Sequence, residues 1–110
     1  MVMSVDSDAK DAVDVLKAVA DPLRMRILTL LAREALCTTH LVEETGARQT
    51  NLSNHLKILR EAGLVDTEPC GRFTYYKLRP DVLDSLAGFL GDLASTARAT
   101  ACADTKRSCP

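Results

Sequence analysis

The sequence is poor in aromatic residues and in long apolar runs. It has no Trp, two Tyr, two Phe and two His among 110 residues. Its longest unbroken apolar stretch is only a few residues, which excludes a membrane-spanning helix. Only five residues are Gly, which excludes a collagen-like chain. The first residues are acidic and lack the apolar stretch of a secretory signal, so we expect a cytoplasmic protein with no membrane partner.

The composition that remains is that of an ordinary folded domain. Hydrophobic residues make up 46% and charged residues 26% of the chain, a balance that argues against disorder. A chain of this length forms one small domain, and self-association would supplement its modest core. The formal net charge is −1, but residues 47–78 hold five Lys and Arg against three Asp and Glu. This local positive excess favours an anion-binding face in the middle of the chain.

The order of apolar periodicities predicts the fold class. Apolar residues at helical spacing, with Asp21-Pro22 as a helix start, predict helices over residues 8–20, 22–33, 37–45, 48–62 and 80–98. Branched and aromatic residues predict a hairpin of strands 64–68 and 73–78, with a turn at 69–72. A mainly α chain with two short helices joined at a Gly and followed by a small β-hairpin is typical of a winged helix-turn-helix. We expect this domain to cover residues 1–98, followed by a flexible, Cys-containing tail over 99–110.

The helix predicted over residues 48–62 has the chemistry of a DNA-reading helix. Leu52, Leu56 and Leu59 form its apolar stripe, so amide and hydroxyl side chains point outward near its N-terminus. Such groups pair with base edges in the major groove, and basic side chains neutralise phosphates. The candidate DNA-binding residues are Arg48, Gln49, Thr50, Asn51, Ser53, Asn54, His55, Lys57, Arg60, Arg72 and Lys77. For His55, a hydrogen-bonded place inside the domain is the alternative to a DNA contact.

Several stretches resemble the ArsR/SmtB family of bacterial repressors, of the arsenic-responsive type. Residues 20–28, with the sequence ADPLRMRIL, are similar to the family's ALADPTRLRIL signature. Residues 49–65 resemble its recognition helix and exit, and residues 71–78 resemble its wing. The resemblance implies a homodimer, formed by the first and last helices, that binds operator DNA and releases it when an inducer binds. Arg48 departs from the family, which often has a Ser cap at this position.

Two of the family's inducer sites have no counterpart in this sequence. One class binds zinc through Asp and His on the last helix, but here both histidines, His40 and His55, lie earlier in the chain. A second class binds cadmium or lead through two cysteines on the recognition helix, and the matching positions here are Ile58 and Ala62. Neither site is therefore expected.

A third inducer class leaves a partial match. Residues 34–41, EALCTTHL, resemble its ELCVCDL motif, but only Cys37 remains, with Thr39 at the second cysteine position. Arsenite takes three sulfur ligands, and the tail supplies Cys102 and Cys109. We therefore expect these three cysteines to bind As(III) or Sb(III) as inducer, because thiolates without histidine favour soft ions.

Other functions stay open at this point. Cys70, at the wing tip, could replace a tail cysteine, and His40 could join Cys37, which would favour Cd(II), Pb(II) or Zn(II). A thiol-redox or sulfide sensor of the same fold would instead link Cys37 to Cys102. An enzyme is not expected, because no nucleophile motif or phosphate-binding loop is present.

Overall fold

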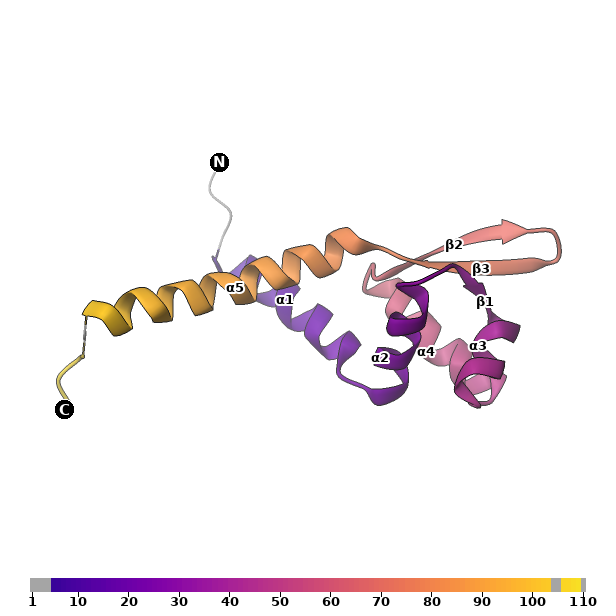
Figure 1. Ribbon diagram of the computed structural model, residues 1–110, viewed down its shortest axis with the longest axis horizontal. Helices are drawn as coiled ribbons and strands as arrows, with labels where there is room; N and C mark the ends of the chain where they lie inside the picture. The colour runs from indigo at the N-terminus through magenta and orange to yellow at the C-terminus, as the bar shows by residue number, and fades with distance from the viewer. Residues whose placement is uncertain (1–4, 104–105, 110) are drawn as a thin grey trace.

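The computed structural model describes residues 5–103 and 106–109 of the chain (Figure 1). Over these residues the elements follow in the order α1 (Val5–Val19), α2 (Pro22–Leu31), β1 (Leu36–Cys37), α3 (Thr38–Thr45), α4 (Gln49–Glu61), β2 (Val65–Cys70), β3 (Phe73–Leu78) and α5 (Pro80–Ala103). Helices α2, α3 and α4 gather under one end of α5, and the β2–β3 hairpin projects beyond them. The predicted class, a mainly α winged helix-turn-helix, is confirmed.

Local sequence signals define the start of α2 and the end of α3. The Asp21 carboxylate accepts hydrogen bonds from the backbone N–H groups of Leu23 and Arg24, at 2.9 and 3.0 Å, and so caps α2. Pro22 occupies the first helical position, where no N–H is needed. Gly46 follows α3 in the left-handed conformation, with φ of 73°, and ends that helix. This residue turns the chain from α3 into α4.

The core lies between the helices and the base of the wing. Leu52, Leu56 and Leu59 of α4 are fully buried, and they join Ile27 of α2 and Leu41 of α3 in one cluster. Fully burying a side chain of this size contributes about 1.5–3 kcal/mol. The apolar face of α4 is therefore fixed against the domain, and its opposite face is fixed toward solvent.

The sheet has a third strand that the sequence analysis did not predict. Strand order is β1-β3-β2, with β1 pairing antiparallel to β3 through Leu36 opposite Tyr76 and Cys37 opposite Tyr75. Residue 37 was predicted as the start of a helix, but it is the last residue of β1. The hairpin is also tighter than predicted, because Pro69 belongs to β2 and the turn comprises residues 71–72. Pro69 is tolerated because β2 is an edge strand.

The last helix is longer than predicted. α5 runs to Ala103 rather than residue 98, so the first residues of the predicted tail are helical. Cys102 lies in the last turn of α5, although its side chain falls outside the described part of the chain. Residues 106–109 are non-helical and exposed. The expected boundary between domain and tail therefore moves toward the C-terminus.

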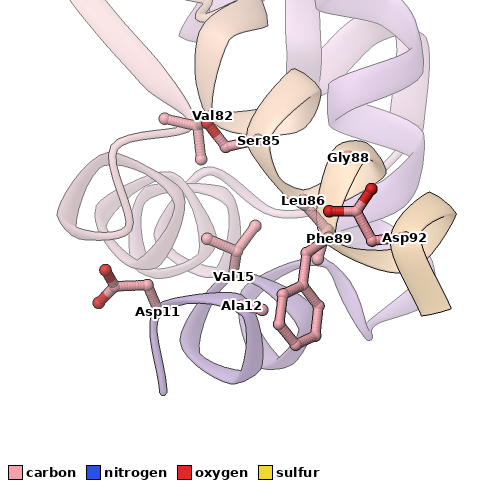
Figure 2. A pocket seen from close by; sticks show the side chains of 9 residues that line it. All are labelled: Asp11, Ala12, Val15, Val82, Ser85, Leu86, Gly88, Phe89 and Asp92. Atoms are coloured by element: carbon pink, nitrogen blue, oxygen red, sulfur yellow. The ribbon is translucent and has the colours of Figure 1, made fainter. Parts of the chain in front are cut away.

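Helices α1 and α5 pack together and leave an open apolar groove of about 530 Å³ between them (Figure 2). Ala12 and Val15 of α1 face Leu86 and Phe89 of α5 across it. Large apolar side chains beside this groove stay in solvent: Val13, Leu16, Leu90 and Leu93 are 37–57% exposed. None of the residues of α5 whose burial is described is fully buried. The pair therefore presents an extended apolar surface that the single chain does not cover.

Substitution of Gly46 by Ala tests the turn between α3 and α4. A Cβ meets no heavy atom within 4 Å at this position, so the effect isolates the positive φ. Because a non-glycine residue in the left-handed region costs about 1–2 kcal/mol, Gly46→Ala should lower the free energy of unfolding by about that amount. Asn visits this region more readily, so Gly46→Asn should lose less. Urea denaturation measures both, and an Ala variant as stable as the wild type would contradict the assignment.

Candidate nucleic-acid interface

The outward face of α4 carries the polar side chains that the sequence analysis selected. Buried leucines at positions 52, 56 and 59 orient the helix, because residues three and four apart share one face. The remaining positions of its first turns are exposed: Gln49, Thr50, Asn51, Ser53 and Asn54. These amide and hydroxyl groups form a contiguous surface that matches the donors and acceptors of base edges in a major groove.

The N-terminus of α4 has no side-chain cap. Arg48 occupies the capping position in an extended conformation, and its side chain makes no capping hydrogen bond. The first backbone N–H groups of a helix point outward and carry partial positive charge, which attracts phosphate. Arg48, in place of a Ser cap, therefore adds a positive charge at the N-terminus of α4, the end that would enter the major groove.

A notch between α4 and the wing gathers cations and hydroxyl groups. It measures about 380 Å³ and is lined by Tyr76 of β3 and by five residues of α4: Ser53, Leu56, Lys57, Arg60 and Glu61. Its two cations outnumber the single carboxylate of Glu61, and with the two hydroxyl groups they suit a phosphate of the DNA backbone. Tyr76 was not among the predicted DNA-binding residues. It reaches the notch through tertiary packing, which no local sequence pattern shows.

The wing carries two further residues that were predicted to contact phosphate, and only one of them is ion-paired. Arg72 is exposed at the tip, directly after Gly71, whose φ of 62° makes the tight turn possible. Lys77 instead forms an ion pair with Glu68 across the hairpin. Such an exposed pair is worth at most about 1 kcal/mol, so a phosphate can replace Glu68. Phe73, 53% exposed beside the tip, adds an apolar side chain to this end of the wing.

His55 is turned away from the outward face of α4. Its side chain is 18% exposed, and its Nδ1 lies 3.1 Å from Nη1 of Arg24 and 3.9 Å from a carboxylate oxygen of Asp21. The contact geometry supports the alternative that the sequence analysis kept open, a hydrogen-bonded place inside the domain. Arg24 was not selected from the sequence, because no local pattern links it to a residue 31 positions away.

The predicted thiol ligands lie in different parts of the structure. Cys37 is buried at the start of α3, Cys70 is exposed on the wing, and Cys109 is exposed in the C-terminal segment. Figure 1 shows residues 106–109 and β1 near opposite ends of the long axis, which measures 62 Å. Among the described residues, no three His, Cys, Asp or Glu side chains gather as a metal site. One chain therefore does not bring Cys37 and Cys109 together.

Cys37 has a close neighbour that sequence spacing also suggested. Its Sγ lies 3.4 Å from Nδ1 of His40, and its backbone N–H donates to the same nitrogen at 3.3 Å. The two ligand atoms of one tetrahedral zinc ion lie about 3.5 Å apart, given Zn–S and Zn–N bonds of about 2.3 and 2.05 Å. The pair thus has the separation of a sulfur–nitrogen chelate. The His40 ring also contacts Tyr75 of β3 edge-on, with 5.9 Å between ring centroids.

Helices α3 and α4, the β2–β3 wing and the cationic notch define a DNA-binding protein of the winged helix-turn-helix class. Residues 21–67 match the model of a family described as bacterial regulatory protein, arsR family. The chain is 38% identical over 77 residues to a transcriptional repressor SmtB homologue of Synechocystis, covering 70% of this chain and 58% of that protein. It is 33% identical over 97 residues to the arsenical resistance operon repressor of Staphylococcus xylosus, covering 88% and 93%.

The comparison of structures agrees. An ArsR-like transcriptional regulator from Rhodococcus superposes with a TM-score of 0.81 at 24% identity, covering 88% of this chain and 92% of that one. The chain belongs to the ArsR family of bacterial transcriptional regulators. Membership in a family of regulators confirms the expectation that it is not an enzyme. No helix within residues 5–103 and 106–109 has the length and apolar character needed to cross a membrane.

The Asp21 cap predicts a pH dependence of stability. The hydrogen bond from the Arg24 backbone N–H, the largest cause, lowers the pKa of Asp21, and the positive charge of Arg24 and the hydrogen bond from the Leu23 backbone N–H also lower it. A carboxyl with a lowered folded pKa contributes stability above its unfolded pKa and loses that contribution as the pH falls through the folded pKa. Asn caps helices as well as Asp does, so Asp21→Asn removes mainly the charge.

We therefore expect the urea midpoint of the wild type to exceed that of Asp21→Asn near neutral pH. The difference should shrink below about pH 4 and disappear once the carboxyl is protonated in both states. Urea denaturation of both proteins from about pH 7 to about pH 2 measures it. A difference that stays constant over this range would show that the charge does not contribute.

Proposed function

We propose that this chain is a dimeric transcriptional repressor that binds operator DNA through α4 and the wing and releases it when a thiophilic ion binds at Cys37. The observation that supports DNA binding is the orientation of α4, whose polar face is exposed beside the cationic notch. The outward amides and hydroxyls would read bases, and Lys57, Arg60 and Arg72 would contact phosphates. Two of the relatives are named as a transcriptional repressor and as an arsenical resistance operon repressor, which agrees with this assignment.

The apolar surface over α1 and α5 supports the dimer. Side chains such as Leu16, Leu90 and Leu93 are exposed there in one chain, which is costly for a single small domain. A second copy on this surface would bury them and complete the groove that Phe89 lines. A two-fold dimer also places two recognition helices about one DNA turn apart, which a palindromic operator requires.

The inducer proposal rests on one observation, the 3.4 Å separation of Cys37 Sγ and His40 Nδ1. Nδ1 now accepts the Cys37 backbone N–H, a hydrogen bond at the start of α3. Metal ligation through this nitrogen would replace that hydrogen bond, because the same lone pair would be used. The first turn of α3 would then rearrange directly upstream of α4. Ion binding would thus favour a dimer with altered recognition helices, as differential affinity requires.

Two classes of ion place different demands on the remaining ligands. Cadmium or zinc accepts mixed sulfur and nitrogen ligands, so the Cys37–His40 pair supports them directly. Arsenite or antimonite takes three thiolates, so Cys102 and Cys109 would have to join Cys37. Since one chain holds Cys37 and Cys109 apart, the tail of a partner chain would have to supply them. The cysteines of the tail therefore separate the two classes experimentally.

Substitutions on α4 test the DNA-reading surface. Asn51→Ala should relax sequence preference at one position and weaken a selected duplex by about 1–3 kcal/mol, because it removes an amide that pairs with a base edge. Lys57→Ala should weaken all duplexes alike and reduce the salt dependence of binding by about one counterion, because it removes a phosphate contact. Fluorescence anisotropy against salt concentration, with a duplex selected from a random-sequence pool, distinguishes these two outcomes.

Lys10→Ala is the matched control for Lys57→Ala. It removes the same charge from an exposed position of α1 that lines neither the notch nor the apolar groove. This variant should bind the selected duplex as the wild type does. If Lys57→Ala and Lys10→Ala behave alike, the notch is not a phosphate site.

Ion titrations of reduced, metal-free protein test the inducer site. Cys37→Ser should abolish both the sulfur-to-ion ultraviolet absorption and the release of DNA by cadmium and by arsenite, since both need this thiolate. His40→Ala should weaken only the response to cadmium, because arsenite uses no nitrogen ligand. The Cys102→Ser/Cys109→Ser variant should lose only the response to arsenite.

Cys70→Ser serves as the control, because this thiol lies on the wing, away from Cys37. It should respond to both ions as the wild type does. A Cys37→Ser variant that still releases DNA on addition of cadmium or arsenite would exclude the proposed site. Release by a thiol oxidant alone, with no response to either ion, would favour the redox sensor instead.

A further inference from the structure

One side chain joins three helices at the base of the DNA-reading unit. The guanidinium of Arg24, in α2, donates from Nε to the Ala18 carbonyl oxygen at 2.6 Å and from Nη2 to the Lys17 carbonyl oxygen at 3.3 Å. Its Nη1 lies 3.1 Å from Nδ1 of His55, in α4. A single residue thus connects the last turn of α1 to the middle of the recognition helix.

The chemistry of this contact fixes the state of the histidine. Arginine has only donors, so Nδ1 of His55 must accept the hydrogen bond and must therefore carry no proton. The carbonyl groups near the end of a helix carry partial negative charge, which favours a cation at the end of α1. Arg24 is therefore held from one side by α1, and it holds His55 from the other.

We propose that the Arg24–His55 hydrogen bond is a positioning link that sets the pose of α4 relative to α1 and so controls sequence-specific operator binding. This inference rests on the proposed function, in which α1 lies in the dimer interface and α4 reads DNA. The arrangement of α4 relative to α1 then determines the separation and tilt of the two recognition helices. His55 acts as a positioning residue, through Arg24, and makes no DNA contact.

The apolar contacts of α4 do not by themselves fix this pose. Leu52 and Leu56 bind the helix to the core, but hydrophobic contacts are non-directional and tolerate small shifts along the helix axis. A hydrogen bond between a charged donor and a ring nitrogen has a preferred distance and angle. The Arg24–His55 contact therefore supplies the directional constraint between the two helices.

Protonation of His55 at Nδ1 would remove the link. The charged groups with a recorded contact to its ring in the described residues are Asp21 and Arg24, both at the start of α2, while α1 contributes carbonyl oxygens through Arg24. A protonated Nδ1 cannot accept from Arg24, and the two cations would repel each other. Asp21, at 3.9 Å, would then compete with Arg24 for the ring. Operator affinity should therefore fall under conditions that protonate Nδ1.

Two substitutions of His55 separate the hydrogen bond from the packing. Asn places its Oδ1 where Nδ1 stands and stays neutral, whereas Leu fills space without an acceptor. His55→Leu should weaken binding of the duplex selected from a random-sequence pool by about tenfold or more, the usual effect of losing a hydrogen bond to a charged group. His55→Asn should stay within about threefold of the wild type. Binding of an unrelated duplex should change in neither variant, because the phosphate-contacting cations remain.

The pH profile gives an independent readout of the same link. On acidification the wild type should lose more affinity for the selected duplex than His55→Asn does, because only the wild type has an Nδ1 that can take up a proton. Both proteins retain His40, so the difference between the profiles belongs to position 55. Arg24→Lys should resemble His55→Leu, because an ammonium group cannot bridge two helices as the guanidinium fork does.

Circular dichroism and gel filtration establish that each variant is folded and of wild-type size before binding is measured. If His55→Leu does not fold, the operator affinities of His55→Asn and Arg24→Lys are compared instead. Wild-type affinity in Arg24→Lys or folded His55→Leu, or equal pH profiles of the wild type and His55→Asn, would overturn the link while leaving the proposed function intact. A wild-type protein that selects no duplex from the pool would overturn both.

Discussion

Burial of the leucine stripe of α4 decides where every other side chain of that helix points. Leu52, Leu56 and Leu59 share one face at helical spacing, and the core takes that face completely. The polar residues of the first turns must then face solvent, whatever their own preferences. The DNA-reading surface is thus a consequence of core packing, and its side chains keep their positions because the leucines cannot rotate outward without exposing apolar area.

The sequence predicted the elements whose signals are local. Asp21-Pro22, the leucine stripe and the aromatic hairpin each depend on neighbours a few residues away, and each is present in the structure. β1 was missed because two residues give no periodicity, and its partner on β3 lies about forty positions further along the chain. The end of α5 was placed too early because small residues beyond residue 98 suit a helix as well as a tail.

The residues of the candidate site also fall into those that local sequence patterns predict and those that depend on tertiary contacts. The outward residues of α4 follow from its periodicity, whereas Tyr76 and Arg24 take their places through tertiary contacts that no local pattern contains. The three-cysteine hypothesis grouped residues by chemistry alone, and chemistry gives no distance. His40 stood at helical spacing from Cys37, and this short-range relation is the one that places a sulfur and a nitrogen at chelating separation.

The position of Cys37 explains how one ion could act on both parts of the DNA-reading surface. Its residue ends β1, which pairs with β3 of the wing, and it also precedes the first turn of α3. Movement there would be transmitted to the wing through the strand pairing and to α4 through the turn at Gly46. The Arg24–His55 contact lies on the other side of α4, toward α1, and resists displacement of that helix. Binding of an ion at the proposed site would therefore have to work against this constraint. The factor by which the ion would lower operator affinity equals the factor by which operator DNA would lower ion affinity, because coupling between two sites is reciprocal.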